Sequence, residues 1–214
     1  MFSAAPAVAA PFAVQLGEAR VGLDAPPGFA DTGFTGSPRL QELAETLTSA
    51  SNRILLFAIS DGDLRRFTVG DAPEFRRYMI AVTPRGLERE RITPGAFNTY
   101  VGESLRELGT APSDPEFAKH LDAQPVGRSS LLAELRREPE AVSVLLGTRL
   151  PPQPGSLFSR DKQQYLLSST TLILLRGKAL SLAVFTAYDS PADLDWIRAI
   201  TARWIEELRR LNSR

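Results

Sequence analysis

Two adjacent pairs of arginines are the side chains in this sequence best suited to hold an anion. They are Arg65, Arg66, Arg76 and Arg77, and a third basic run lies at 85–91. A guanidinium group can donate two parallel hydrogen bonds to a carboxylate or phosphate, so converging groups would bind an anionic ligand or an acidic partner. Acidic residues alternate with them from residue 63 to residue 90, and alternating charge is typical of a solvated surface. The four arginines are therefore candidate ligand-binding residues, and the surface interpretation stays open.

Catalytic and metal-binding side chains are scarce. His120 is the only histidine, cysteine is absent, and no G-x-S-x-G motif supplies a serine nucleophile. Without cysteine there are no thiolate nucleophiles, iron–sulfur clusters or Cys-ligated zinc, and one histidine is too few for most zinc and iron enzymes. Asp61-Gly62-Asp63 lacks the other ligands of a calcium loop and is interpreted as a turn that ends a strand. We therefore expect no catalytic residue set, no metal and no cofactor.

A glycine-rich segment, residues 33–37, precedes a predicted helix. Backbone N–H groups at such a position can hold a phosphate, but the lysine of a P-loop and the third glycine of a dinucleotide fingerprint are missing. The segment is interpreted as a loop that ends with Ser37 as a helix cap. Phe29 and Phe34 flank a loop of Asp, Thr and Gly residues at the start of this region. Their exposure for a partner contact and their burial under the following helix are both open.

Composition restricts the partners. The chain of 214 residues has 25 basic and 25 acidic side chains, and this balance argues against a broad nucleic-acid interface. No apolar run reaches the roughly 20 residues needed for a transmembrane helix. Length and composition suit one globular domain, predicted at 12–214.

Residues 1–11 form an uncharged leader rich in alanine and proline. Ala7-Val8-Ala9 has the A-x-A form of a signal-peptidase site, whereas the basic region of a secretory signal is missing. Export to the periplasm, with a mature chain near Ala10 or Pro11, and a cytoplasmic protein with a disordered leader both stay open. Because cysteine is absent, we expect no lipid anchor.

Hydrophobic periodicity and turn residues predict the elements that would position these side chains. Strands are expected at 14–16, 20–23, 54–60, 77–83, 141–150, 164–175 and 179–187. Helices are expected at 38–50, 94–108, 115–121, 129–137 and 191–211. The strands at 54–60 and 77–83 should pair. Those at 164–175 and 179–187 should form the middle of the sheet, joined by Arg176-Gly177-Lys178, and 151–155 should be a rigid exposed loop.

Strands at both ends of the chain, with helices between and after them, indicate an α+β fold: a mainly antiparallel sheet with helices packed on its faces. Val21–Phe29, a strand that leads into a proline–glycine–aromatic turn, resembles the start of PsbP/Mog1-like domains. The apolar hairpin Tyr165–Ala187, followed by Ser190-Pro191 and a helix with tryptophans, is similar to their C-terminal part. The resemblance implies an α/β/α sandwich whose relatives mostly bind partners or assist assembly, and it brings no shared catalytic residues.

Together these observations favour a non-enzymatic, exported bacterial domain that binds a protein partner or assists assembly of the envelope. One alternative is an enzyme or binding protein for a small anionic ligand, using arginine and carboxylate side chains with His120 as an optional acid or base. Another is an accessory protein that works through the edge of its sheet. The sequence leaves the partner and the oligomeric state open.

Overall fold

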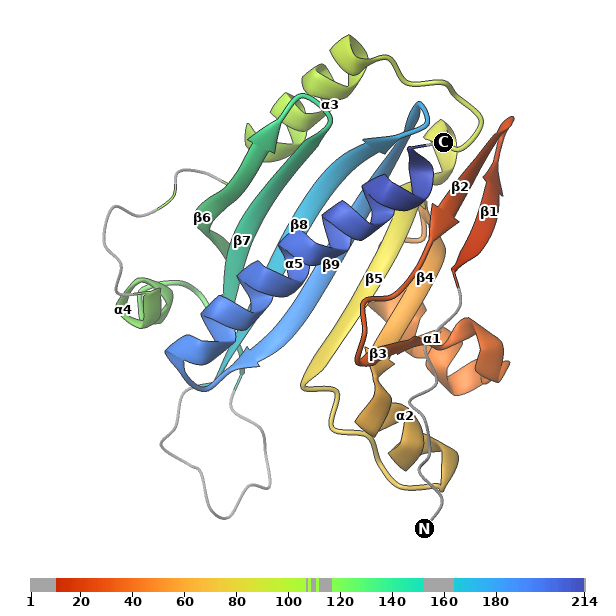
Figure 1. Cartoon of the computed structure of the whole chain (residues 1–214). Coiled ribbons are helices and arrows are strands. Elements are labelled where there is room, and N and C mark those ends of the chain that lie inside the picture. Colours follow the sequence, from red (N-terminus) through yellow and green to blue (C-terminus); the bar gives the residue numbers. More distant parts are fainter. Residues whose placement is uncertain (1–10, 107, 109–110, 112–116, 152–163, 214) are drawn as a thin grey trace.

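One antiparallel sheet organises the chain (Figure 1). The computed structural model describes residues 11–106, 108, 111, 117–151 and 164–213. Seven strands form the sheet in the order β3-β4-β5-β9-β8-β7-β6, and all neighbouring strands are antiparallel. The strands are β3 (Phe29–Asp31), β4 (Asn52–Ser60), β5 (Arg77–Pro84), β6 (Ser129–Glu138), β7 (Ala141–Arg149), β8 (Tyr165–Leu175) and β9 (Lys178–Tyr188).

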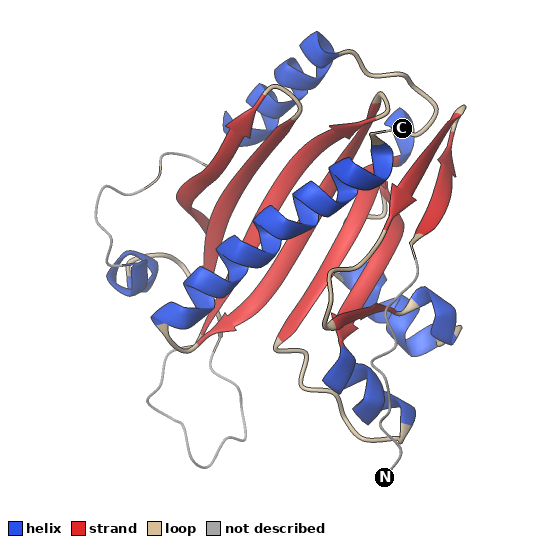
Figure 2. Cartoon of the chain, viewed as in Figure 1, coloured by secondary structure: helices blue, strands red, loops and turns tan. Residues whose placement is uncertain are grey.

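Helices cover both faces of the sheet (Figure 2). They are α1 (Pro38–Thr46), α2 (Asp61–Thr68), α3 (Pro94–Arg106), α4 (Phe117–Asp122) and α5 (Pro191–Asn212). A separate hairpin of β1 (Phe12–Leu16) and β2 (Ala19–Leu23) lies on the same face as α5, which crosses the sheet diagonally. On the opposite face lie α1, against β4 and β5, and α3, against β7 and β8.

The two faces are filled by alternate residues of the strands, because successive side chains of a strand point to opposite sides. The face toward α5 and the hairpin contributes Ala58, Met79, Ala81, Leu182 and Val184 to the largest core cluster. The opposite face contributes Phe57, Ile59, Ile80 and Val82, which pack against Leu40 and Ala44 of α1. A third cluster joins Phe97 and Val101 of α3 to Val142 and Leu172. The predicted α+β sandwich is confirmed.

Several local predictions are confirmed with small changes of boundary. β4 pairs with β5, and the hairpin of β8 and β9 occupies the middle of the sheet. Its turn has two residues rather than three, Arg176 and Gly177, with φ angles of 52° and 75°. This backbone suits the right-handed twist of the flanking strands. The last helix begins at Pro191, directly after Ser190, as the proline and the acidic first turn predicted.

The prediction of a helix over 129–137 is wrong, because these residues form β6. Ser129 to Glu138 pairs along its length with β7, and tertiary pairing overrides the helical propensity of the segment. Leu131 and Leu132 are adjacent, so a helical stripe and a strand beside a bulge both fit the local pattern. In the strand, the side chain of Leu132 is buried in the core.

The interpretation of Asp61-Gly62-Asp63 as a turn is also wrong, because these residues open α2. The N–H of Asp63 donates to the Ser60 Oγ at 3.1 Å, which caps the helix. Asp61 and Asp63 lie at the positive end of the helix dipole. The first helix, α1, ends at Thr46 rather than at residue 50. Most of the predicted loop at 151–155 and the predicted helix start near 115 lie outside the described residues.

The aromatic side chains near the N-terminus and in α5 differ in exposure. Trp204 is buried, and its indole N–H donates to the carbonyl of Asp24 at 2.8 Å. Phe29 is also buried, with its ring centroid 6.1 Å from that of Trp196, so it packs on the α5 face and not under α1. Phe34 is 75% exposed. Core packing therefore accounts for Trp204 and Phe29.

Candidate functional site

The outer strand β4 has an unpaired edge along part of its length. Ala58–Ser60 pairs with β3, and the Phe57 carbonyl accepts the N–H and the Oγ1–H of Thr32 at 2.8 and 2.9 Å. Residues 52–56 pair with β5 on one side, whereas no strand of the described chain pairs with them on the other side. We call residues 52–56 the open edge. A bulge at Leu55 interrupts its pairing with β5.

A groove of about 640 Å³ runs between the open edge and α1. Its wall on α1 includes Gln41, Ala44, Glu45 and Thr48. Its other wall is β4 itself, and one end is closed by the segment that follows β3. Figure 1 shows α1 lying beside β4 at this side of the sheet. The fold therefore places a strand edge and a helix flank side by side, with space between them.

Asp31 marks the acidic end of the groove. Its carboxylate accepts the N–H of Gly33 at 3.2 Å, next to the hydrogen bonds that join Thr32 to Phe57. Burial raises the pKa of Asp31, while the backbone N–H groups of Gly33, Phe57 and Thr32 oppose that rise. Glu45 of α1 lines the same groove. Because burial disfavours its charge, the Asp31 carboxylate is suited to receive a cation.

Arginines lie at the other end of the groove. Arg53 of β4 forms an ion pair with Glu88 and donates to the carbonyl of Gln15 at 3.3 Å. Arg85 donates to the carbonyl of Ala50, also at 3.3 Å. Both arginines line the groove, and their contacts hold the hairpin of β1 and β2 and the loop after β5 in place. The groove thus changes from acidic to basic along its length.

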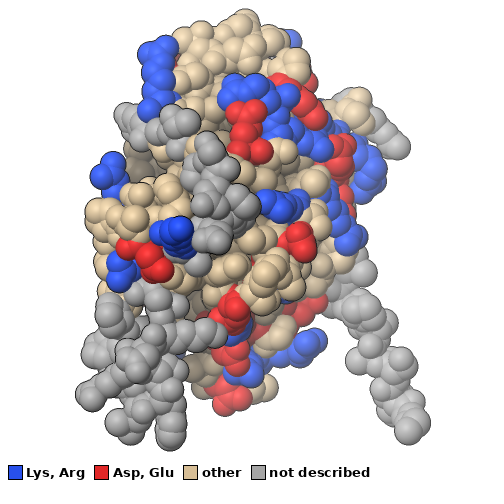
Figure 3. Space-filling model, turned by 90° about the vertical axis from the view of Figure 1, so that its left-hand side faces the viewer, with Lys and Arg blue, Asp and Glu red and all other residues tan. Residues whose placement is uncertain are grey.

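The opposite edge of the sheet, β6, is closed by charge and by irregular pairing. Its register with β7 shifts twice, between Leu131 and Ala133 and between Glu134 and Arg136. Two ion pairs join β6 to α5, Arg136 with Glu206 at 2.7 Å and Arg209 with Glu138 at 2.5 Å. Two more lie within β6, Arg136 with Glu138 at 3.3 Å and Arg137 with Glu134. Figure 3, which looks onto this side of the molecule, shows basic and acidic side chains intermingled. Bulges and charges are the usual protection of a strand edge.

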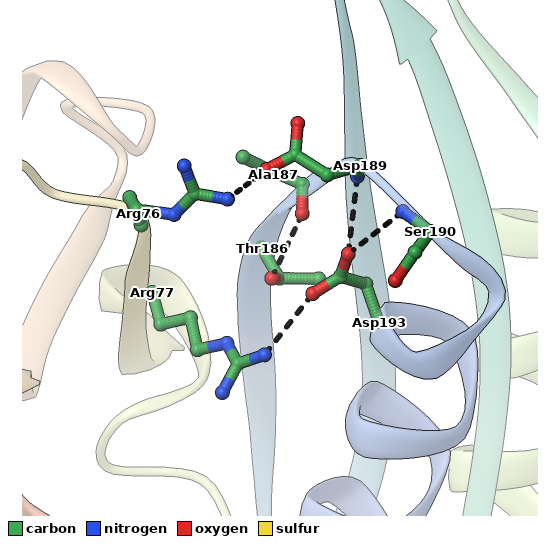
Figure 4. A network of polar contacts seen from close by, with 7 residues as sticks. All are labelled: Arg76, Arg77, Thr186, Ala187, Asp189, Ser190 and Asp193. Atoms are coloured by element: carbon green, nitrogen blue, oxygen red, sulfur yellow. Dashed lines mark hydrogen bonds and ion pairs between the residues drawn. The ribbon is translucent and has the colours of Figure 1, made fainter.

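The four candidate arginines do not gather on one site. Arg65 is exposed on α2, and Arg66 of the same helix forms an ion pair with Glu74 at 2.8 Å. Arg76 and Arg77 reach two different carboxylates after β9 (Figure 4). These are Asp189 for Arg76 and Asp193 for Arg77, the latter at 3.0 Å. Three of the four positive charges are therefore balanced within the chain.

Arg77 also has a packing role. Its guanidinium lies 4.1 Å from the centroid of the Trp196 ring, so it bridges a carboxylate and an aromatic face. Asp193 is 7% exposed, and its other oxygen accepts the N–H of Asp189 at 3.0 Å and of Ser190 at 3.1 Å. Burial raises the pKa of Asp193, but these N–H groups and Arg77 outweigh burial and lower it overall. This network fixes the start of α5 on β5.

The other sequence candidates lie apart from the groove. His120 is half-buried on α4, which contacts β7 on the far side of the sheet (Figure 1). Among the described residues, no cluster of three or more acidic or histidine side chains has the geometry to hold a metal ion. Nor does any helix in the described ranges have the length and apolar character needed to cross a membrane. Within the segment 33–37, Gly33–Thr35 forms a short 3-10 helix, and Gly33, Gly36 and Ser37 border the groove.

Sequence reasoning missed Asp31, Gln41 and Glu45. Asp31-Thr32-Gly33 is a local signal for a turn, because an aspartate often accepts the N–H two residues ahead. Nothing local shows that β3 covers only the end of β4, since this depends on where Phe29–Asp31 pairs with β4. The open edge is a property of the assembled sheet.

Comparison with known proteins adds information about the fold. No protein-family model and no curated protein matches this chain. The solved structure of the Ran-binding protein Mog1p of Saccharomyces cerevisiae is similar, with 13% identity, a TM-score of 0.39 and 94% of each chain covered. A single-residue mutant of protein Mog1 is similar with 14% identity and a TM-score of 0.38, over 95% of this chain and 93% of the other. This likeness agrees with the resemblance to PsbP/Mog1-like domains noted from the sequence, and it concerns the arrangement of the elements alone.

Proposed function

We propose that this domain binds a protein partner by adding an extended segment of that partner to the open edge of β4. The main support for this proposal is the unpaired edge at residues 52–56 with a groove of about 640 Å³ beside it. Unpaired N–H and C=O groups of an edge strand can hydrogen bond to another chain, and a neighbouring groove selects alternate side chains of the added strand. Side chains of the added segment that point toward α1 would contact Gln41 and Thr48.

The charges in the groove favour a segment with a basic side chain. Asp31 lies near one end and Glu45 lines the wall on α1, whereas Arg53 at the other end is already paired with Glu88. A lysine or arginine of the partner would therefore find its complement beside Asp31. The residues two positions before and after this basic residue would be apolar, because every second residue of an added strand faces the groove.

Selection of a random peptide library against the domain would test this proposal. We expect the selected peptides to share an alternating apolar pattern with one basic residue. When a peptide binds, amides of the open edge, residues 52–56, should exchange with solvent more slowly in NMR hydrogen-exchange spectra. Protection centred on β6 or α5 instead would refute the proposal.

A pair of variants at Gln41 provides the control. Gln41 is exposed and lines the groove, so Gln41→Trp should fill the groove and abolish peptide binding, whereas Gln41→Ala should preserve it. Neither change removes a buried contact, and both variants should unfold at the same temperature as the natural chain. Equal peptide affinity in Gln41→Trp and Gln41→Ala would contradict a site in this groove.

The site of action is proposed on the sequence alone. We propose that the protein is exported to the bacterial periplasm, on the strength of the Ala7-Val8-Ala9 pattern in an uncharged leader. Cell fractionation should then recover the protein in the periplasm, with an N-terminus near Ala10 or Pro11. Recovery in the cytosol with Met1 intact would refute export.

A further inference from the structure

A second pocket, of about 670 Å³, lies on the other flank of α1. It opens where the end of β9, the start of β8 and the segment before β5 converge. Aromatic side chains dominate its wall: Phe57, Phe75, Tyr78, Tyr165 and Tyr188. Leu43 and Leu47 of α1 add to the apolar lining, as do Leu150, Leu166 and Ala187. We call this space the aromatic pocket.

The rings of the aromatic pocket hold one another in place. Tyr78 stacks on Phe185 with ring centroids 4.7 Å apart and meets Phe57 edge to face at 6.5 Å. Tyr165 and Tyr188 form another edge-to-face pair at 6.3 Å. Such pairs stabilise the ring orientations. The wall is therefore formed in advance of any ligand.

Phe75 lines the pocket through an unusual backbone conformation. Its φ angle of 48° lies in the left-handed region, which is uncommon for a residue with a large side chain. The preceding residue is held by a buried group, because the N–H of Glu74 donates to the Asp63 carboxylate at 2.7 Å. Asp63 is 6% exposed and also accepts the Ser60 hydroxyl at 2.9 Å. The cap of α2 thus fixes the loop that presents Phe75.

The charged groups at the rim are already paired. Arg76 forms an ion pair with Asp189, and Glu74 forms one with Arg66 at 2.8 Å. The Tyr165 hydroxyl donates to Asp122, a residue of α4 that does not line the pocket, at 2.6 Å. Burial, and then this hydrogen bond, raise the pKa of Tyr165 to about 12. The pocket therefore offers no unbalanced charge to a ligand.

The Tyr78 hydroxyl differs from these groups. Within the described chain it has no hydrogen-bond partner, although the residue is half-buried and lines the pocket. Burial also raises the pKa of Tyr78, so the hydroxyl keeps its proton and remains a donor. Such a donor can exchange its contact with water for a hydrogen bond to an acceptor of a ligand in the pocket.

We propose that the aromatic pocket binds a small neutral molecule with a flat ring system and one hydrogen-bond acceptor, to which the Tyr78 hydroxyl donates. The volume of about 670 Å³ lies in the range typical of small-molecule sites. Rings stack or meet edge to face with the aromatic wall, and neutrality follows from the paired rim. This site is distinct from the groove of the proposed strand addition at β4, although Phe57 lines both.

Prodan, a neutral naphthalene ketone with solvent-sensitive fluorescence, is a suitable probe. It should bind the natural chain with saturation and with a blue-shifted emission. Tyr78→Phe keeps the ring and removes the donor, so the affinity should fall about two- to tenfold. Tyr100→Phe, in the core cluster of α3, is the matched control and should leave the affinity unchanged. Equal affinity of Tyr78→Phe and the natural chain would refute the role of the hydroxyl.

Filling the pocket gives a second test. Ala187 lines the pocket, so Ala187→Phe should abolish saturable binding while the circular dichroism spectrum stays native. If this folded variant still binds prodan, the site lies elsewhere. Absence of saturable binding by the natural chain would overturn the proposal, as would displacement of prodan by the peptides selected for the open edge.

Discussion

Replacement of Asp193 tests the conclusion that Arg77 supports the fold rather than a ligand. The Asp193 carboxylate accepts two backbone N–H groups at the start of α5 and the Arg77 guanidinium at 3.0 Å. Asp193→Ala removes all three hydrogen bonds, whereas Asp193→Asn keeps an acceptor for the N–H groups and loses the charge. The two variants therefore separate the cap of the helix from the ion pair.

The expected loss follows from these contacts. Loss of an acidic cap costs about 1 kcal/mol. Loss of a partly buried hydrogen bond between charged groups costs about 1.5 kcal/mol more, reduced because Arg77 is partly exposed. Asp193→Ala should therefore lower the free energy of unfolding by about 2–3 kcal/mol, and Asp193→Asn by about 1 kcal/mol. For a chain of this length, the former corresponds to about 5–10 °C in Tm.

Urea denaturation at neutral pH and at acid pH is the assay. Because the folded-state pKa of Asp193 is lowered, its contribution is complete above the unfolded value of about 3.9 and disappears as pH falls through the folded value. The difference in the free energy of unfolding between the natural chain and Asp193→Asn should therefore disappear at acid pH. Equal stability of Asp193→Ala and the natural chain at neutral pH would refute this account, as would a gap that persists in acid.

Three further changes have defined outcomes. In Gly147→Ala, the new Cβ would lie 2.8 Å from methyl groups of Leu121 and Leu132, so differential scanning calorimetry should show a loss of about 1–2 kcal/mol. Lys178→Met removes the hydrogen bonds from the buried Lys178 to the carbonyls of Glu88 and Glu90, at 3.1 and 2.6 Å, and should cost about 1–3 kcal/mol in chemical denaturation. Burial raises the pKa of Asp31, so its charge does not stabilise the fold at neutral pH. Asp31→Asn should therefore maintain stability while isothermal titration shows about tenfold weaker binding of basic peptides; no change in affinity would argue against Asp31 as the acidic end of the groove.

Local patterns predicted the elements whose signals are short-range. The Ser190-Pro191 start of α5 and the glycine of the β8–β9 turn depend on residues next to each other in sequence, and both predictions are confirmed. The prediction of a helix at 129–137 was wrong because pairing with β7 determines the conformation of this segment. The helix α2 was missed although Ser60 and Asp63 carry a capping pattern, because the strong strand before it suggested a turn.

The candidate site was less predictable than the fold. Arginines suggested an anion site, but the carboxylates that pair with Arg76 and Arg77, Asp189 and Asp193, are more than 100 positions away in sequence. The open edge depends on sheet order, and Lys178 is buried by a loop 88 to 90 residues away. Long-range pairing of this kind leaves no periodic pattern. An accessory role through a sheet edge was one of the alternatives that the sequence left open, and it remains a prediction.

The difference between the two sheet edges sets the stoichiometry of any assembly through strands. With β6 closed by ion pairs and bulges, the seven-stranded sheet, as far as the described residues show it, is open to strand addition on its β3–β4 side. Growth into a fibre needs two complementary edges on each copy, so head-to-tail polymerisation through the sheet is blocked. Addition at β4 therefore ends with a single partner, either one foreign strand or the same edge of a second copy across a two-fold axis.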